Sequence, residues 1–291
     1  MSTDPVVRLP EWARKSSPLA RGARGVRVLL RRGGLHTVCE EARCPNLGEC
    51  FSRGTATFLL LGDRCTRRCG YCSVRTERPL PPDPGEPRRV AEAVARMRLR
   101  YVVLTSVNRD DLADGGAAHF AATVSEVHRA APGAGVEVLT PDFGGEPAAL
   151  ATVLDASPEV FNHNIETVPR LFPRLRPRGD YQRSLKVLEA AGAHRPAPRT
   201  KSGLMVGLGE TDEEVERVLV ELRAVGVDIV TIGQYLRPSR GHEPVQRYLP
   251  PEGFARLEAR ARALGFSTVH CGVFVRSSYG AEEVYRDGGR S

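Results

Sequence analysis

The sequence predicts an α/β fold in which strand-like and helix-like segments alternate along most of the chain. Three observations support this prediction. The strand-like runs are rich in Val, Ile, Leu and Phe, a helix-like segment follows each run, and the alternation occurs six times. Strands that alternate with helices pair in parallel within one sheet. Six units are fewer than the eight of a closed (β/α)8 barrel, so we expect a partial (β/α)6, TIM-like barrel with its chemistry at the carboxyl ends of the strands.

The expected elements are six strand and helix pairs in chain order. They are 57–62 with 88–99, 101–106 with 116–131, 136–139 with 146–156, 159–164 with 181–192, 203–208 with 211–225, and 227–233 with 251–264. Thr211 and Glu214 form a capping box at the start of the fifth helix, and Gly226 follows its end. We therefore expect three regions: an N-terminal extension over 1–56, a barrel over 57–265 and a C-terminal extension over 266–291.

Composition excludes several classes of protein. Hydrophobic residues make up 41% and charged residues 26% of the chain, as in ordinary globular proteins. The longest clean apolar run, 58–61, is far shorter than the roughly 18 residues of a membrane span, and the N-terminus has no apolar stretch typical of a secretory signal. The net charge of +7 comes almost entirely from dispersed arginines without a long basic block, which argues against nucleic-acid binding. We expect a cytoplasmic protein with neither a membrane nor a nucleic acid as partner.

Six of the seven cysteines lie between Cys39 and Cys72, in two triplets. The first triplet has the spacing C-x4-C-x5-C and the second C-x3-C-x2-C; their members are Cys39, Cys44 and Cys50, then Cys65, Cys69 and Cys72. Clustered cysteines in a cytoplasmic protein more often bind metal than form disulfides. Zinc fits poorly, because structural zinc sites have four ligands in close pairs and each triplet offers three. The second spacing instead suits three irons of a cubane cluster whose fourth iron stays open.

The loop Cys65–Cys72, with Tyr71 before its last cysteine, resembles the loop that defines radical S-adenosylmethionine enzymes. This resemblance implies a [4Fe-4S] cluster on Cys65, Cys69 and Cys72 whose open iron chelates S-adenosylmethionine. Electron transfer from the reduced cluster then releases a 5′-deoxyadenosyl radical, so an external electron donor is implied as well.

The first triplet narrows the resemblance to the lipoyl synthase family, and other segments over about residues 10–285 are similar to that family too. These segments are TSVNRDD at 105–111, DGG at 114–116, NHNIETV at 162–168, KSGLMVGLGE at 201–210, GQYLRP at 233–238 and RSSY at 276–279. The family implies a second, auxiliary [4Fe-4S] cluster on Cys39, Cys44 and Cys50, with Ser278, favoured over Ser277, as fourth ligand. It also implies a position for Arg276 beside that cluster, where it orients the carbon radical or the partner.

The same resemblance implies the reaction. Two sulfur atoms from the auxiliary cluster enter an octanoyl chain carried on a lysine of a lipoyl carrier domain. The implied partners are octanoylated carrier domains of the 2-oxoacid dehydrogenase acyltransferase subunit and the glycine cleavage H protein.

Polar residues at the strand ends are candidates for binding S-adenosylmethionine. Ser106, Asn164 and Glu166 follow strands on the expected active face, where amide and carboxylate groups suit ribose hydroxyls. Lys201 has two interpretations: it pairs with the carboxylate of S-adenosylmethionine, or it forms a structural salt bridge. For Asp110, Asp111 and Asp114, a solvated loop that caps a helix and a role in orienting substrate both stay open.

Two other functions remain open at this point. One is a different radical S-adenosylmethionine enzyme whose auxiliary cluster transfers electrons or binds substrate, although a permanent redox relay favours a fourth cysteine over a serine. The other is a non-enzymatic interaction protein held by zinc. Cys271 stands alone and the histidines show no metal-ligand spacing, so we assign none of them a ligand role.

Overall fold

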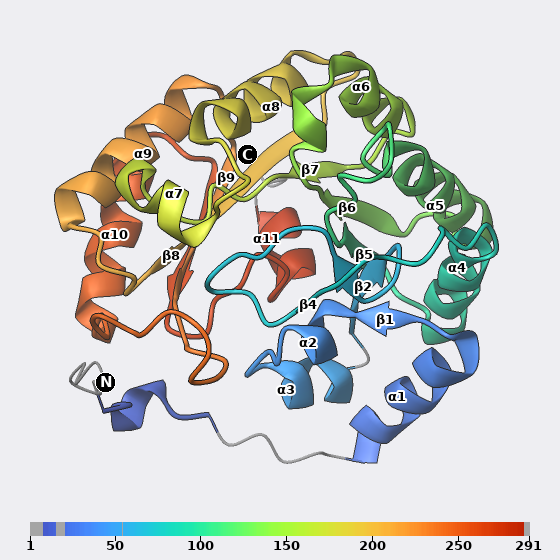
Figure 1. Cartoon of the computed structure of the whole chain (residues 1–291), viewed down its shortest axis with the longest axis horizontal. Helices are drawn as coiled ribbons and strands as arrows, with labels where there is room; N and C mark the ends of the chain where they lie inside the picture. The colour runs from blue at the N-terminus through green and yellow to red at the C-terminus, as the bar shows by residue number, and fades with distance from the viewer. Residues whose placement is uncertain (1–7, 16–20, 54, 288–291) are drawn as a thin grey trace.

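A computed structural model of the chain describes residues 8–15, 21–53 and 55–287. Its main sheet has the strand order β1-β2-β5-β6-β7-β8-β9-β10 and curves into an open barrel (Figure 1). The strands are β1 (His36–Thr37), β2 (Thr57–Leu60), β5 (Tyr101–Ser106), β6 (Gly135–Leu139), β7 (Val160–Asn162), β8 (Arg199–Val206), β9 (Ile229–Gln234) and β10 (Thr268–Gly272). The pairs from β2 to β10 are parallel, and β1 is antiparallel to β2. This arrangement confirms the predicted α/β fold and partial barrel.

Six long helices form a ring outside the strands (Figure 1). They are α4 (Glu86–Met97), α5 (Ala117–Ala130), α6 (Pro147–Asp155), α8 (Tyr181–Ala193), α9 (Asp212–Ala224) and α10 (Pro251–Ala263), and they match the predicted helices to within two residues at either end. The capping box of Thr211 and Glu214 is present at the start of α9. Gly226 follows α9 with a φ of 84°, a conformation that favours glycine. No helix in the part of the chain that the structure describes is long and apolar enough to cross a bilayer.

The sheet contains one parallel strand more than the sequence predicted. β10 pairs with β9 from Thr268 to Gly272, a segment assigned above to the C-terminal extension. The prediction missed this strand because its sequence TVHCG has only two strongly β-forming residues and ends in glycine. The barrel therefore extends past residue 265.

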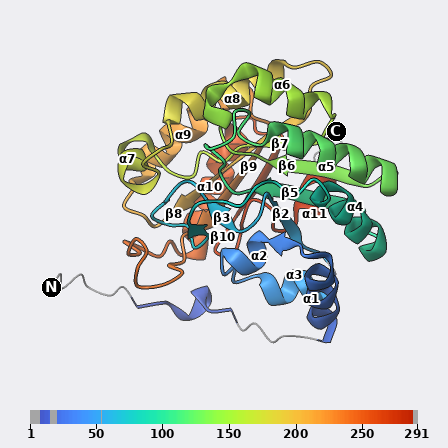
Figure 2. The ribbon, with the colours of Figure 1, turned by 45° about the vertical axis from the view of Figure 1, so that its right-hand side comes forward.

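The shorter elements lie before, between and after the six units. They are α1 (Arg21–Gly33), α2 (Val38–Glu41), α3 (Leu47–Ser52), the pair β3 (Arg64–Cys65) and β4 (Arg75–Thr76), α7 (Phe172–Leu175) and α11 (Ala281–Asp287), with single 3-10 turns at Glu11–Ala13, Phe143–Gly145 and Pro169–Leu171. Of the first cysteine triplet, Cys39 lies in α2, Cys50 in α3 and Cys44 in the turn between them. Both views show α2 and α3 beneath the strands β2 and β5 (Figure 2).

The N-terminal extension and the C-terminal segment are hydrogen-bonded to each other across the opening between β1 and β10. Asn46, before α3, donates from its side-chain amide to the carbonyl of Phe274 at 2.7 Å. Tyr279 donates its hydroxyl to Glu49 Oε1 at 2.9 Å. These bonds connect residues about 230 positions apart in the sequence, so the C-terminal segment completes the wall that the sheet leaves open.

Helix α11 closes the amino end of the barrel. Tyr285 of α11 stacks on Tyr101 at the start of β5, with ring centroids 5.2 Å apart. Arg199, the first residue of β8, donates to the carbonyl of Tyr285 at 2.9 Å. Because the amino end is closed in this way, access to the barrel interior lies at the carboxyl ends of the strands.

Apolar packing between the sheet and the helices holds this frame. Leu104 of β5 and Phe120 and Val124 of α5 belong to one buried cluster, and Val230 of β9 and Leu219 of α9 to another. Full burial of one such side chain contributes about 1.5–3 kcal/mol. The strand ends that carry polar side chains are therefore held on a rigid support.

Candidate active site

A cavity of about 510 Å³, here called the large cavity, lies at the carboxyl ends of the strands. The second cysteine triplet lines it together with residues from the ends of successive strands. These residues are Ser106, Thr140, Asn164, Met205 and Leu236. The edge of the barrel at which the sequence placed the chemistry is thus the edge that contains the large cavity.

The cysteine loop between β2 and β5 is anchored by Arg67, which is only 5% exposed. One of its guanidinium nitrogens lies 2.7 Å from Asp110 and 2.7 Å from Asp142, which follow β5 and β6. A second anchor is the amide of Gly70, which donates to the carbonyl of Leu175 at 2.8 Å. These contacts fix the loop against three neighbouring parts of the barrel, so its thiols have defined positions.

The thiols of this loop face the cavity from a largely desolvated setting. Burial raises the pKa of Cys72 to about 12 and also raises the pKa of Cys69. Cys65 Sγ accepts hydrogen bonds from the backbone amides of Asn108 at 3.3 Å and Arg67 at 3.4 Å. Because their pKa values are raised, the thiols of Cys69 and Cys72 are mainly protonated without metal, and metal binding releases the protons. Three soft sulfur donors around an open cavity fit an iron–sulfur cluster with one iron free.

The first cysteine triplet lines a second cavity of about 210 Å³, here called the small cavity. Ser278 and Arg276 of the C-terminal segment line it too. Burial raises the pKa of Cys39 to about 12 and that of Cys50 to about 11. The structure therefore brings three thiols and one hydroxyl from opposite ends of the chain to one place, a donor set that fits a second cluster with a harder fourth ligand.

The two cavities share a wall. Cys39, Cys44, Arg276 and Ser278 line both of them, whereas Cys50 lines only the small cavity and Ser277 only the large one. Burial lowers the pKa of Arg276, and the neighbouring Cys44 opposes this shift. These four shared side chains thus lie between a ligand bound in the large cavity and a ligand bound in the small cavity.

Asn164 and Glu166 project into the large cavity just after β7, as the sequence suggested. Asn164 Nδ2 donates to Glu166 Oε1 at 3.2 Å. Burial raises the pKa of Glu166, while the nearby Arg176 and the bond from Asn164 act in the opposite direction. Glu166 has a φ of 69°, a strained value for a residue with a side chain, and such strain is concentrated at functional sites.

Ser106 and Arg176 complete the polar side of the large cavity. The Ser106 hydroxyl is buried and has no hydrogen-bond partner among the described residues, which suits a site that receives a polar ligand. Arg176, only 7% exposed, donates to the backbone carbonyl of Asn164 at 3.0 Å. Sequence reasoning missed Arg176, because it lies in the run PRLRPR at 173–178, where nothing distinguishes the buried arginine from the exposed ones.

Solved structures share the fold of this chain. The FeFe-hydrogenase maturase HydG from Carboxydothermus hydrogenoformans superposes with a TM-score of 0.61 at 14% identity, covering 79% of this chain and 55% of that chain. Methylornithine synthase gives a TM-score of 0.54 at 16% identity, covering 78% and 67%. At these identities the similarity establishes the fold alone.

Sequence comparison is more specific. Residues 59–222 match the radical SAM superfamily. A lipoyl synthase from Rubrobacter xylanophilus is 54% identical over 281 residues, which cover 97% of this chain and 88% of the relative. A lipoyl synthase from Thermus thermophilus is 55% identical over 95% of this chain and 86% of the relative.

The chain belongs to the lipoyl synthase family. It is accordingly a radical SAM enzyme, and membership of that superfamily implies S-adenosylmethionine and a [4Fe-4S] cluster as cofactors.

In this member of the lipoyl synthase family, Lys201 has a structural position rather than one in the large cavity. Lys201 Nζ is completely buried between the two carboxylate oxygens of Glu137, at 2.9 and 3.0 Å. Tyr101 and Asn162 bond to the same carboxylate at 3.0 and 2.8 Å. Lys201 is therefore removed from the candidates for binding S-adenosylmethionine, because its charge is already compensated inside the barrel.

The aspartates after β5 also hold the protein together. Asp110 bonds to Arg67 and to Thr66 of the cysteine loop. Asp114 accepts from the amides of Gly116 and Ala118 at 2.9 and 2.8 Å, at the start of α5. Of the two interpretations for these residues, the structure favours the loop and helix contacts over contact with substrate.

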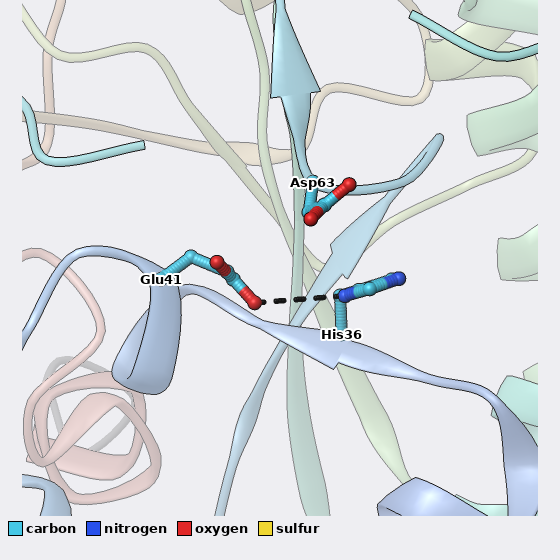
Figure 3. Close-up of side chains that lie close together, drawn as sticks. All are labelled: His36, Glu41 and Asp63. Carbon is cyan, nitrogen blue, oxygen red and sulfur yellow. Dashed lines mark ion pairs between the residues drawn. The ribbon is translucent and has the colours of Figure 1, made fainter. Parts of the chain in front are cut away.

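Two further groups near the lipoyl synthase site have ordinary explanations. Cys271 of β10 packs against the second apolar cluster and lines neither cavity. His36, Glu41 and Asp63 lie close together between β1, α2 and the segment after β2 (Figure 3). His36 pairs with Glu41 at 3.6 Å and Asp63 pairs with Arg75, so ion pairs account for this cluster without a metal.

Proposed function

We propose that this enzyme inserts two sulfur atoms into an octanoyl chain attached to a lysine of a lipoyl carrier domain. The observation that supports the proposal is the wall shared by the two cavities, because members of both cysteine triplets line the large cavity. Radical formation and sulfur donation then act on one bound chain without its release.

The cysteine loop would hold the [4Fe-4S] cluster of the superfamily through Cys65, Cys69 and Cys72. With S-adenosylmethionine bound, that cluster supplies a 5′-deoxyadenosyl radical, which takes a hydrogen atom from an octanoyl carbon. The residues Ser106, Asn164 and Glu166 bind the ribose hydroxyls of S-adenosylmethionine in our proposal, and Arg176 balances the charge of Glu166. Their task is to fix the adenosyl group beside the chain to be attacked.

The first triplet would hold an auxiliary [4Fe-4S] cluster, with Cys39, Cys44, Cys50 and Ser278 as its ligands. Bound there, that cluster supplies the sulfur atoms. An oxygen ligand is harder than a thiolate and binds iron less firmly, which suits a cluster that is consumed. Arg276 in the shared wall positions the substrate chain between the two sites.

The walls of the large cavity suit an acyl chain. Leu59, Val107, Leu139, Met205 and Leu236 line it from several strands and loops. An apolar wall binds a hydrocarbon chain and excludes water from a reactive radical. Polar groups that bind S-adenosylmethionine and apolar groups that bind the chain thus occupy the same cavity.

The substrate in this proposal is a protein. The carrier domains are those of the 2-oxoacid dehydrogenase acyltransferase subunit and the glycine cleavage H protein, and an external donor supplies electrons. Arg43 is exposed at the edge of the large cavity, and the chain carries a net charge of +7. A positive surface accelerates the encounter with an acidic carrier.

An anaerobic reaction with S-adenosylmethionine, a reductant and an octanoyl-lysine peptide tests this function. Mass spectrometry is expected to show a peptide that has gained two sulfur atoms as the dithiol under these reducing conditions. Reoxidation to the cyclic disulfide then removes two hydrogen atoms. Cys39→Ala is expected to abolish sulfur insertion while 5′-deoxyadenosine still forms, and Cys69→Ala is expected to abolish both.

Cleavage of S-adenosylmethionine with an unchanged peptide, in protein shown to contain both clusters, would contradict the proposal. That result would favour a radical enzyme whose auxiliary cluster transfers electrons or binds substrate. Sulfur insertion by the Cys39→Ala variant would remove the auxiliary site as the sulfur source.

A further inference from the structure

The two consecutive serines of the RSSY segment point to different places. Ser278 lines both cavities, whereas Ser277 lines only the large one. The Ser277 hydroxyl donates to Asn164 Oδ1 at 2.8 Å, across 113 positions of sequence. This bond connects the C-terminal segment to the end of β7, on the side of the barrel proposed above to hold S-adenosylmethionine.

The bond from Ser277 holds the Asn164 amide in place beside Glu166. An asparagine side chain has an oxygen that accepts and a nitrogen that donates. In the structure Oδ1 accepts from Ser277 while Nδ2 donates to Glu166 Oε1 at 3.2 Å, so the amide is held from both ends. Without the serine hydroxyl the amide keeps only its bond to Glu166, and its plane is free to tilt about that bond.

The backbone of β8 leaves room for this contact only because residue 203 is glycine. A Cβ atom at Gly203 would lie 2.8 Å from Asn164 Oδ1, 2.8 Å from Ser277 Oγ and 2.7 Å from Thr231 Oγ1. Such distances are too short for a carbon atom, so any side chain at this position would displace the serine and the amide. The close approach of the three polar atoms depends on this one residue.

We propose that Ser277 is a positioning residue for S-adenosylmethionine, acting through Asn164 and Glu166. The hydroxyl restrains the amide, and the restrained amide and the carboxylate together present one donor and one acceptor to the ribose diol. This inference rests on the S-adenosylmethionine site proposed above. The two neighbouring serines then have different roles: Ser277 positions Asn164 at the S-adenosylmethionine site, and Ser278 is a ligand of the proposed auxiliary cluster.

Equilibrium dialysis of S-adenosylmethionine against the anaerobically reconstituted full-length protein tests this role. Loss of one hydrogen bond of about 1 kcal/mol corresponds to roughly a fivefold change in affinity. Ser277→Ala is therefore expected to weaken binding of S-adenosylmethionine about fivefold, with iron and sulfide per chain unchanged. The matched control Ser278→Ala is expected to lower the iron and sulfide content and to leave binding near that of the parent protein.

Two further variants separate positioning from a general structural defect. In an Asn164→Ala background, Ser277→Ala is expected to cause almost no additional loss of affinity, because the serine acts through the amide. Gly203→Ala leaves the sequence of the RSSY segment unchanged, but the new Cβ displaces Ser277 Oγ and Asn164 Oδ1. This variant is therefore expected to weaken binding of S-adenosylmethionine to a similar extent.

Unchanged affinity in Ser277→Ala, or equal additional losses in the parent and Asn164→Ala backgrounds, would overturn the inference. Loss of iron from Ser277→Ala without loss from Ser278→Ala would overturn it as well, because Ser277 would then be the cluster ligand. The assay contains no octanoyl substrate, so a failure of sulfur insertion leaves its outcome unaffected and the two proposals fail separately.

Discussion

His163, next to Asn164, shows how a single buried residue makes the stability of the folded protein depend on pH. The ring is fully buried, with Nδ1 2.9 Å from the carbonyl of Thr140 and Nε2 3.1 Å from Ser184 Oγ. Burial lowers the pKa of His163 to about 4 from an ordinary 6.5, and the positive Arg176 acts in the same direction. The folded protein therefore keeps this histidine neutral at a pH where the unfolded chain protonates it.

As the pH falls from 7 to 4, we expect the free energy of unfolding to decrease by about 3 kcal/mol because of His163 alone. The lowered pKa gives this sign: the stabilisation is complete above the unfolded pKa and is lost as the pH approaches the folded one. Urea unfolding between pH 7 and pH 4.5 measures the decrease. The variant His163→Gln removes the titrating group, so its unfolding free energy is expected to fall less steeply, and equal slopes in the two proteins would contradict this assignment.

Some side chains of the candidate site could be predicted from the sequence alone, and others could not. Spacing selected the six cysteines, and the strand ends selected Ser106, Asn164 and Glu166; the structure has all nine lining the two cavities, while their roles stay predictions. Lys201 was ambiguous because its partner Glu137 lies 64 positions away and the burial of both depends on the barrel interior. Arg176 gave no signal for the same reason. Residues whose position follows from local pattern are predictable, and residues whose position follows from distant packing are not.

At the scale of elements, the cysteine loop depends on the ion pairs of Arg67. Removal of this guanidinium leaves Asp142 completely buried without its main counter-charge. Breaking a buried pair from one side costs about 3–5 kcal/mol. We therefore expect Arg67→Ala to lower the free energy of unfolding by that amount, as measured in urea.

Arg88→Ala is the matched control for Arg67→Ala. Arg88 pairs with Glu92 on the exposed face of α4 at 3.0 Å, and its loss is expected to cost less than about 1 kcal/mol. Similar losses for the two variants would show that the Arg67 pairs do not hold the loop.

The secondary structure was largely predictable because each of the six units repeats the same local pattern. Long amphipathic helices carry a clear periodic signal, and buried strands such as Tyr101–Ser106 stand out as continuous apolar runs. Short elements do not: β1 has two residues and α2 has four, too few to show a period. The part of the N-terminal extension formed by β1 and α2 therefore acquires its structure from contacts with the barrel and the C-terminal segment rather than from its own pattern.

At the scale of the whole molecule, Asn46 links the N-terminal extension to the C-terminal segment. Its side chain, 1% exposed, bonds to the carbonyl of Phe274 at 2.7 Å and to Lys15 Nζ at 2.6 Å. Loss of both bonds in Asn46→Ala is expected to cost about 2 kcal/mol. Hydrogen exchange is expected to accelerate in 38–52 and 273–280 together, while α9 on the far side of the barrel exchanges as before. Acceleration in only one of the two segments would show that they do not stabilise each other.

The distance in sequence between the parts of the small cavity has a consequence for the biogenesis of the protein. Chains leave the ribosome amino end first, at roughly 5–20 residues per second, so on the order of ten seconds or more separates the emergence of Cys39 from that of Ser278. During that interval Cys39, Cys44 and Cys50 lack the segment that completes their wall. Under the proposal above, the auxiliary site would be completed only after Ser278 has been made. Until then its three cysteines must be kept from oxidation and stray metals.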